Sequence, residues 1–170
     1  ELAPDERILW CGQPHPARAA RPAAANAAID HVRAAFAAGC HVVTANKGPA
    51  AFAFTSLRAA ADGAGVSFLF EGAVMDGIPV FNLVRDTLPA VEILGFRGFV
   101  KSTTNHILSA LEDGEAFGPA LARMQAEGIA EADPSLDVDG WDAAAKTAAL
   151  ANVLMNAGLT PHAVARTGIG

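Results

Sequence analysis

Apolar residues recur with helical spacing along much of the chain. Ile29, Val32 and Phe36 form one such series, which predicts a helix over residues 26–39 with Asn26 as its N-cap and Gly39 at its end. A second helix is predicted from Pro49 to about residue 62. The same criteria predict four more helices, at about residues 78–87, 103–112, 117–127 and 140–157.

Short, mainly apolar runs predict strands between these helices. They are "ILW", "HVVTA", "VSFLFE" and "VEILGFRG", the last at residues 91–98. A proline-rich connection follows the first run. The strand-helix-strand order up to residue 70 predicts parallel neighbours in a sheet, whereas three successive helices end the chain. We therefore place a domain boundary near residue 71, which gives units of 1–70 and 71–170.

Composition limits the classes of function. Of the 170 residues, 52% are hydrophobic and 18% are charged, as expected of a globular protein. The net charge of −6 and the lack of a basic stripe argue against nucleic acid as a partner. Apolar runs are too short for a membrane span, and the acidic start differs from a signal peptide, so we expect a cytoplasmic protein. Cys11 and Cys40 lack metal-binding spacing.

The stretch "EADPSLDVDGWDAAAKTA" places five carboxylates before Lys146. One interpretation is structural: Asp139 caps a helix, Asp142 completes a capping box, and Asp142 and Lys146 form an i,i+4 ion pair. On a helical wheel, however, Lys146 falls on the apolar face with Leu150, while Asn152 falls on the other side. A cation on that face needs a partner, and Asp142 is the nearest.

A lysine enclosed by carboxylates is a tunable proton donor. The same carboxylates could instead bind the ammonium group of a substrate. Both interpretations indicate a small molecule resembling an amino acid, although a lysine can also extend its charge from an apolar face into water.

Four motifs, "HVVTANKGPA", "FEGAVMDGIPV", "STTNHIL" and "GIAEADPSLDVDGWDAAAK", resemble the homoserine dehydrogenase family. Members of that family interconvert L-homoserine and L-aspartate 4-semialdehyde with NAD(P), a step in threonine and methionine biosynthesis. The resemblance implies an α/β fold: the C-terminal part of a Rossmann-like parallel sheet, followed by an α+β substrate and dimerisation domain. It also implies a homodimer.

The resemblance implies roles for the residues that match family motifs. Lys146 would transfer the proton, Asp142 would hold Lys146, and Lys47 would lie where cofactor and substrate meet. A surface lysine is the alternative for Lys47. The substrate contacts would come from Glu131, Asp137 and Thr103, and the cofactor contacts from Lys47 and Gly128. Thr103 also suits a helix N-terminus.

A monovalent-cation site, for sodium, is also implied by the resemblance. Its ligands would be Glu71 and the backbone carbonyls of Val74, Asp76 and Ile78. The alternative for Glu71 is an acid that caps the helix starting near Ile78.

The chain departs from the family pattern in three places. Met75 and Asp76 stand where glycines are usual, "KST" at residues 101–103 replaces "NGT", and the glycine-rich G-x-G-x-x-G string is absent from these residues. Two alternatives to the dehydrogenase therefore stay open. One is an inactive, self-associating fragment, and the other is a related dehydrogenase with a different substrate.

Overall fold

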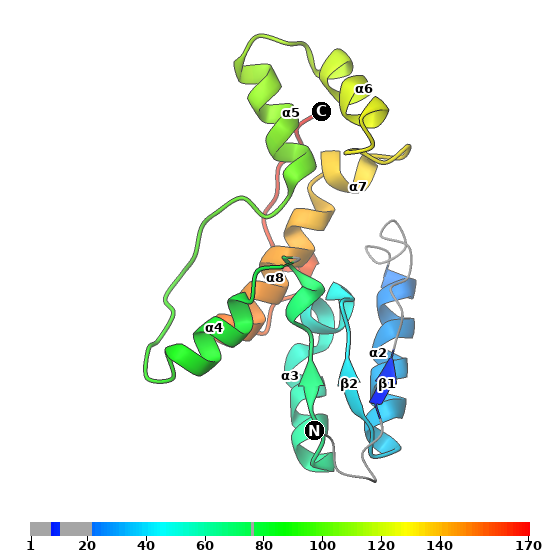
Figure 1. Cartoon of the computed structure of the whole chain (residues 1–170), viewed down its shortest axis with the longest axis vertical. Helices are drawn as coiled ribbons and strands as arrows, with labels where there is room; N and C mark the ends of the chain where they lie inside the picture. Colours follow the sequence, from blue (N-terminus) through cyan, green and yellow to red (C-terminus); the bar gives the residue numbers. More distant parts are fainter. Residues whose placement is uncertain (1–7, 11–21, 76) are drawn as a thin grey trace.

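The computed structural model describes residues 8–10, 22–75 and 77–170. Within them, β1 (Ile8–Trp10), β2 (His41–Val43) and β3 (Phe68–Leu69) form a parallel sheet in the order β1-β2-β3 (Figure 1). Val42 pairs with Leu9 on one side and with Phe68 on the other. The predicted α/β class with a parallel sheet is confirmed. The proline-rich connection after β1 falls mostly outside the described residues, as does Cys11.

Helix α2 (Pro22–Ala37) starts four residues earlier than the sequence suggested. Asn26 therefore lies exposed inside the helix, and its prediction as the N-cap is wrong. Proline has no N–H to lose at the first helical position, and the alanines after it favour helix, so the helix extends back to Pro22. The predicted end is close: Gly39 has a φ of 71°, a left-handed conformation suited to glycine.

Helix α3 (Lys47–Ala64) is the second predicted helix, two residues longer at each end. The side chain of Asn46 caps it by accepting a hydrogen bond of 2.8 Å from the N–H of Gly48. Gly65, with a φ of 65°, ends it. Because Lys47 is the first residue of α3, the cap fixes its position just beyond β2.

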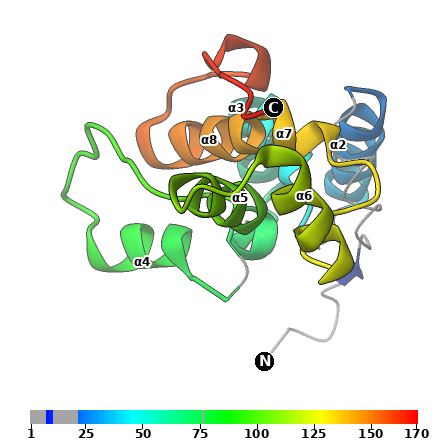
Figure 2. The ribbon, with the colours of Figure 1, turned by 90° about the horizontal axis from the view of Figure 1, so that it is seen from above.

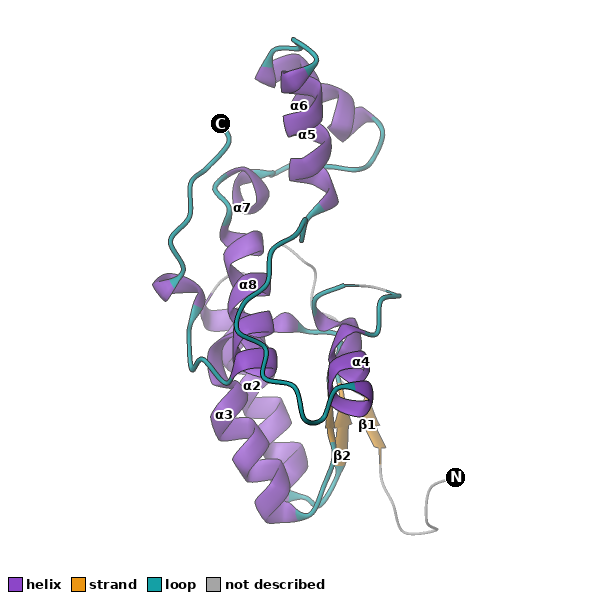
Figure 3. Ribbon diagram, turned by 90° about the vertical axis from the view of Figure 1, so that its left-hand side faces the viewer, coloured by secondary structure: helices purple, strands orange, loops and turns teal. Residues whose placement is uncertain are grey.

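One face of the sheet is buried and the other is open. Val42 and Phe68 are 0% and 6% exposed, whereas their neighbours Val43 and Leu69 are 41% and 43% exposed. Figure 3 shows α2 and α3 together on one side of the strands. The alternation of side chains along each strand thus directs every second residue into the core.

The second half of the described chain is helical. Its helices are α4 (Val80–Thr87), α5 (Ser102–Glu112), α6 (Phe117–Ala126), α7 (Ser135–Val138) and α8 (Trp141–Met155), with short 3₁₀ turns η1 (Glu71–Ala73) and η2 (Pro161–Ala163). The four longer helices match predictions, and α7 is additional. Figure 2 shows α8 lying across α3.

Alanines let α3 and α8 approach closely. Ala50 and Ala51 of α3, and Ala148 and Ala149 of α8, are each 0% exposed. Side chains this small allow the two helix backbones to pack tightly. Helix α8 therefore joins the main core, while α5 and α6 enclose a smaller one around Ile107 and Met124. The boundary at residue 71 stays a prediction.

The strand expected at residues 91–98 is wrong. These residues belong to a long connection between α4 and α5 with neither helix nor strand (Figure 1). Leu94 and Phe99 are 81% and 83% exposed. A strand requires a neighbouring strand for its backbone hydrogen bonds, and none of the described strands pairs with this segment.

Candidate active site

Asp142 lies at the centre of a charged cluster near the start of α8. A sharp turn at Gly140, with a φ of 78°, separates α7 from α8 and places Asp142 in the first turn of the helix. The expected cap at Asp139 is wrong, because Gly140 is the N-cap and no side chain caps α8. Asp142 is only 6% exposed. The helix N-terminus favours its negative charge, but burial requires cationic partners as well.

Three lysines from three segments surround this carboxylate. Lys47, at the start of α3, donates a hydrogen bond to Oδ1 of Asp142. On the other oxygen, Oδ2, the Nζ atoms of Lys101 and Lys146 lie at 3.7 Å and 3.9 Å. Their side chains are 13% (Lys47), 24% (Lys101) and 17% (Lys146) exposed. Ammonium groups from α3, from the residue before α5 and from α8 therefore meet at one acid.

These are the three lysines of the chain, whose other fixed cations are nine arginines. Lysine differs from arginine in that its ammonium group can lose a proton within a protein. The cluster thus concentrates the cations that are able to take part in proton transfer.

Lys146 points inward, as its place on the helical wheel predicts. Its Nζ donates a hydrogen bond of 2.8 Å to the carbonyl oxygen of Val100 and lies within ion-pair distance of Asp142. The expectation that Asp142 is its partner is confirmed, but the direct hydrogen bond of Asp142 goes to Lys47. The carboxylate orients Lys146 without hydrogen bonding to it.

Asp137 of α7 extends the cluster. Its Oδ1 lies 3.1 Å from Nζ of Lys101, and its side chain is 11% exposed. Burial alone lowers the pKa of Lys101, but the charges of Asp142 and Asp137 raise it above its ordinary value of 10.5. Glu131, which is half-buried, adds an effect of the same sign. Lys101 is therefore fully charged at neutral pH.

The pKa of Asp142 is shifted in the opposite direction from an isolated buried acid. Burial raises the pKa, but the charge and hydrogen bond of Lys47 lower it, and Lys101 and Lys146 lower it further. The pKa of Asp142 therefore lies below its ordinary value of 3.8. Asp142 therefore stays ionised and holds the lysines together.

One oxygen in this cluster lacks a hydrogen bond. Oδ2 of Asp142 is buried and has no hydrogen-bond donor among the described residues. The ammonium groups of Lys101 and Lys146 lie too far from it to donate at normal hydrogen-bond lengths. An unsatisfied buried acceptor is costly, so this oxygen is suited to accept a hydrogen bond from a bound hydroxyl or ammonium group.

Thr103 and Gly128 support the loop that carries Glu131. Thr103 is 2% exposed, lies in the first turn of α5, and donates a hydrogen bond of 3.2 Å to the carbonyl oxygen of Ile129. Gly128 follows the end of α6 with a φ of 73°, and no atom lies within 4 Å of the position a Cβ would take. Both residues lie next to the loop, while the contacts predicted for them with substrate and cofactor stay predictions.

Glu71 has a structural role. Its two carboxylate oxygens accept hydrogen bonds of 2.8 Å and 2.9 Å from the N–H groups of Phe81 and Asn82 at the start of α4. This is the capping alternative, while the cation site predicted at Glu71 stays a prediction. Val74 is 3% and Ile78 55% exposed, and Asp76 lies outside the described residues. No cluster of three or more acidic, histidine or cysteine side chains suited to a metal occurs in the described part of the chain.

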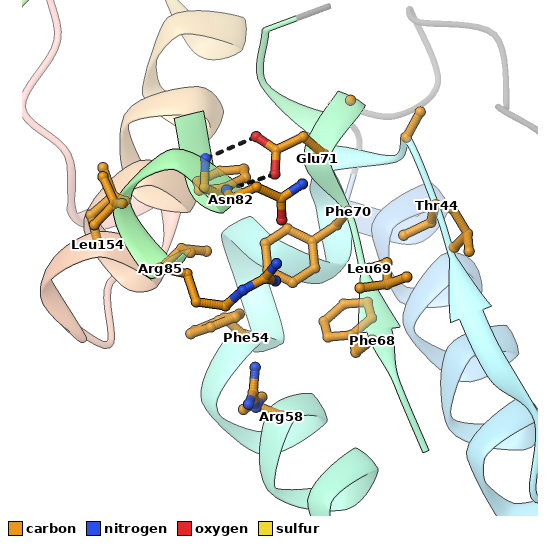
Figure 4. Close-up of a pocket in the computed structure, with 16 residues that line it drawn as sticks. Thr44, Phe54, Arg58, Phe68, Leu69, Phe70, Glu71, Asn82, Arg85 and Leu154 are labelled. Carbon is orange, nitrogen blue, oxygen red and sulfur yellow. Dashed lines mark hydrogen bonds between the residues drawn. The ribbon is translucent and has the colours of Figure 1, made fainter. Parts of the chain in front are cut away.

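An apolar pocket of about 580 Å³ lies apart from the lysine cluster. Figure 4 shows Phe54, Phe68 and Phe70 in it, with Glu71 hydrogen bonded at its edge. None of the three lysines nor Asp142 lines this pocket. The pocket and the charged cluster are therefore separate features of the molecule.

Sequence reasoning missed Lys101 as a member of the site. In the sequence this lysine is a departure from the family motif, and its distant partners Asp137 and Asp142 leave no local signal. Asn152 was placed away from the apolar face of α8. It is in fact 3% exposed, because α8 is buried on several sides.

Comparison with known proteins identifies relatives of one kind. The family model for homoserine dehydrogenase matches residues 79–170. The NAD(+)-dependent homoserine dehydrogenase of Pseudomonas canavaninivorans is 44% identical over 142 residues, which is 84% of this chain and 40% of that protein. Homoserine dehydrogenase of Sulfurisphaera tokodaii is 41% identical over 131 residues, 77% of this chain and 43% of that protein.

Solved structures agree. A homoserine dehydrogenase from Thiobacillus denitrificans superposes with a TM-score of 0.78 at 36% identity, over 95% of this chain and 35% of that one. A hyperthermophilic archaeal homoserine dehydrogenase in complex with NADPH gives 0.68 at 30% identity, over 76% and 40%. The chain thus spans about two fifths of the length of the curated relatives above. Within the described residues we find no helix with the length and apolar character that a membrane crossing requires. The chain belongs to the homoserine dehydrogenase family.

Proposed function

We propose that this chain supplies the substrate-binding and proton-transfer part of an enzyme that interconverts L-homoserine and L-aspartate 4-semialdehyde with NAD(P). The observation that carries the proposal is the convergence of the three lysines of the chain on Asp142, in a chain that belongs to the homoserine dehydrogenase family. Such a cluster provides a proton donor, a group to orient it and charges for an amino-acid substrate.

Lys146 is the proton-transfer residue. Its ammonium group donates to the Val100 carbonyl and lies close to the charge of Asp142, so two contacts orient it beside the acidic segment. In the direction of reduction, Lys146 gives its proton to the aldehyde oxygen as hydride reaches the carbonyl carbon, and an alcohol forms. In oxidation, neutral Lys146 takes the hydroxyl proton. General acid-base assistance of this kind contributes about 10²- to 10⁴-fold.

Glu131 and Asp137 receive the substrate ammonium. Both belong to the acidic segment after α6, in which Oδ1 of Asp137 lies 3.1 Å from Nζ of Lys101. Thr103 fixes the preceding loop through Ile129 and so holds Glu131 in place. Two carboxylates facing a single ammonium distinguish an amino acid from a simple hydroxy acid.

Nicotinamide cofactors supply or accept the hydride when bound. Lys47 fits a place beside such a cofactor because it follows β2, and ligands of parallel sheets bind beyond the carboxyl ends of the strands. Gly128 fits as well, since the space where a Cβ would stand is open. We further propose a cytoplasmic homodimer, in keeping with the exposed apolar side chains of Leu94 and Phe99.

The test is to assay a panel of substrates with the complete gene product. The absorbance of NAD(P)H reports the turnover of each substrate. We expect turnover of homoserine and of aspartate 4-semialdehyde, and little of 4-hydroxybutyrate, which lacks the ammonium group. Turnover of the panel without preference for an amino group would contradict the proposal.

A second candidate function is an inactive, self-associating module. The observation in its favour is the exposure of Val43, Leu69, Leu94 and Phe99, which leaves apolar surface uncovered. Light scattering beside the activity assay separates the two: assembly without turnover of any semialdehyde supports this candidate. Turnover of a related semialdehyde in preference to the aspartate one would instead support the altered dehydrogenase.

A further inference from the structure

Lys101 and Asp137 form an ion pair at the edge of the charged cluster. The atoms Nζ and Oδ1 lie 3.1 Å apart, between the start of α5 and the helix α7. With a side chain 24% exposed, Lys101 is the most accessible of the three lysines. Lys47 is hydrogen bonded to Asp142, and Lys146 to the Val100 carbonyl. Lys101 is therefore the most open of the three lysines to a ligand.

The cluster holds ions of both signs. The ammonium groups of Lys47, Lys101 and Lys146 lie close to the carboxylates of Asp137 and Asp142, and the charge of Glu131 also acts on Lys101. A ligand with a single charge would leave one of these groups without a partner in a partly buried place, which is costly. A zwitterion keeps the balance, because it brings one charge of each sign.

We propose that Lys101 binds the carboxylate of the amino-acid substrate, after the substrate has opened the ion pair between Lys101 and Asp137. The substrate ammonium takes the place of Lys101 at Asp137, and the freed ammonium of Lys101 turns to the substrate carboxylate. One ion pair becomes two, and no buried charge is left alone. This inference rests on the function proposed above and assigns to it the residue that recognises the carboxylate.

Two features of the site support this exchange. Lysine carries its charge on a flexible four-carbon stem, so the ammonium can move while its backbone stays fixed before α5. In addition, Oδ2 of Asp142, which is unsatisfied among the described residues, lies 3.7 Å from Lys101. A substrate entering between Lys101 and Asp137 would bring a hydrogen-bond donor within reach of Oδ2 of Asp142.

The experiment compares Lys101→Met and Lys101→Arg with the unaltered protein, using the complete gene product. The ligands are homoserine and 3-amino-1-propanol, which is homoserine without its carboxylate. Turnover gives KM and kcat for homoserine, competition gives the inhibition constant of the amino alcohol, and calorimetry gives both affinities directly.

For Lys101→Met we expect KM for homoserine to rise about tenfold or more, with a smaller fall in kcat, since a charge-assisted contact is lost. Affinity for 3-amino-1-propanol should stay equal or increase, because Asp137 is free. Lys101→Arg, which keeps the charge, should recover part of the homoserine affinity.

Equal weakening of both ligands by Lys101→Met would overturn the inference and indicate a structural role. Unchanged affinity for homoserine would overturn it too. Failure of the proposed function gives a different result, because the unaltered protein then turns over no homoserine. In that case calorimetry on the unaltered protein and on Lys101→Met still measures whether Lys101 contributes to homoserine binding. If the unaltered protein also fails to bind homoserine, both proposals are wrong.

Discussion

The ammonium group of Lys47 donates a hydrogen bond to the carboxylate of Asp142, which lies 95 positions further along the chain. This contact joins the start of α3 to the start of α8, at the end where Lys101 and Lys146 also converge. The close packing of alanines between the two helices fixes the distance between their ends. The fold therefore determines the spacing of the charged cluster.

Asp142 should be the most important charge for stability. Asp142→Asn leaves three ammonium groups close together without their shared anion, and removing one partner from a buried pair costs about 3–5 kcal/mol. Urea unfolding of the 170-residue chain measures this change in the free energy of unfolding. Asp62→Asn is the matched control, because its ion pair with Arg58 is exposed and worth less than about 1 kcal/mol. Equal effects of the two substitutions would contradict the account.

The contribution of Asp142 should also depend on pH in one direction. Its pKa in the folded chain lies below the ordinary 3.8, so the carboxylate stabilises the fold above that value and the contribution is lost as pH falls through the folded pKa. The difference in stability between the unaltered chain and Asp142→Asn should thus be full at neutral pH and shrink below pH 3.8. A difference that grows on acidification would be inconsistent with the lowered pKa.

The side chain of Asn152 should stabilise the packing of α8 against α3 and against the chain that follows α8. A break in α3 at Ala53, with a φ of −143°, interrupts the helical hydrogen bonds nearby. The side-chain amide of Asn152 donates to the carbonyls of Ala50 and Ala51 and forms a reciprocal pair with Leu159. Asn152→Ala should cost about 1–3 kcal/mol, since buried acceptors lose their donor.

Thermal unfolding of Asn152→Ala beside Asn26→Ala checks this role. Asn26 is exposed within α2, where alanine is the better helix former, so the control should be neutral or slightly stabilising. A neutral Asn152→Ala would show that the break in α3 needs no such stabilisation.

Glu71 should behave as a helix cap and not as a cation ligand. Glu71→Ala removes the acceptors for two N–H groups at the start of α4 and should cost about 0.5–2 kcal/mol. Asp86→Ala, on the exposed side of α4, is the control without effect. Melting temperatures in sodium chloride and in choline chloride of equal ionic strength should agree. A higher melting temperature in sodium chloride than in choline chloride, lost in Glu71→Ala, would instead support the cation site.

The helices could be predicted from the sequence because their signals are local. Ile29, Val32 and Phe36 repeat at helical spacing, and Gly39 and Gly65 stop helices where only left-handed backbone allows the turn. The same periodicity placed Lys146 on the inner face of α8. The strand at residues 91–98 failed because a strand depends on a partner that its own sequence does not specify.

The contacts between the residues of the site could not be predicted from local sequence patterns. Asp142 was assigned to Lys146, one turn away, because an i,i+4 pair is visible in sequence, whereas the partner it hydrogen bonds is distant Lys47. Lys101 joins the cluster only because the fold brings the start of α5 next to α7. Such contacts follow from tertiary packing, to which periodicity gives no access.

The most direct test of the central claim is the turnover number of Lys146→Met in the complete gene product, with homoserine and NAD(P) at saturation. The account predicts a fall in kcat of about 10²- to 10⁴-fold with little change in nucleotide affinity, because the variant keeps the bulk of the side chain but has no proton to transfer. A kcat close to that of the unaltered protein would remove Lys146 from the mechanism.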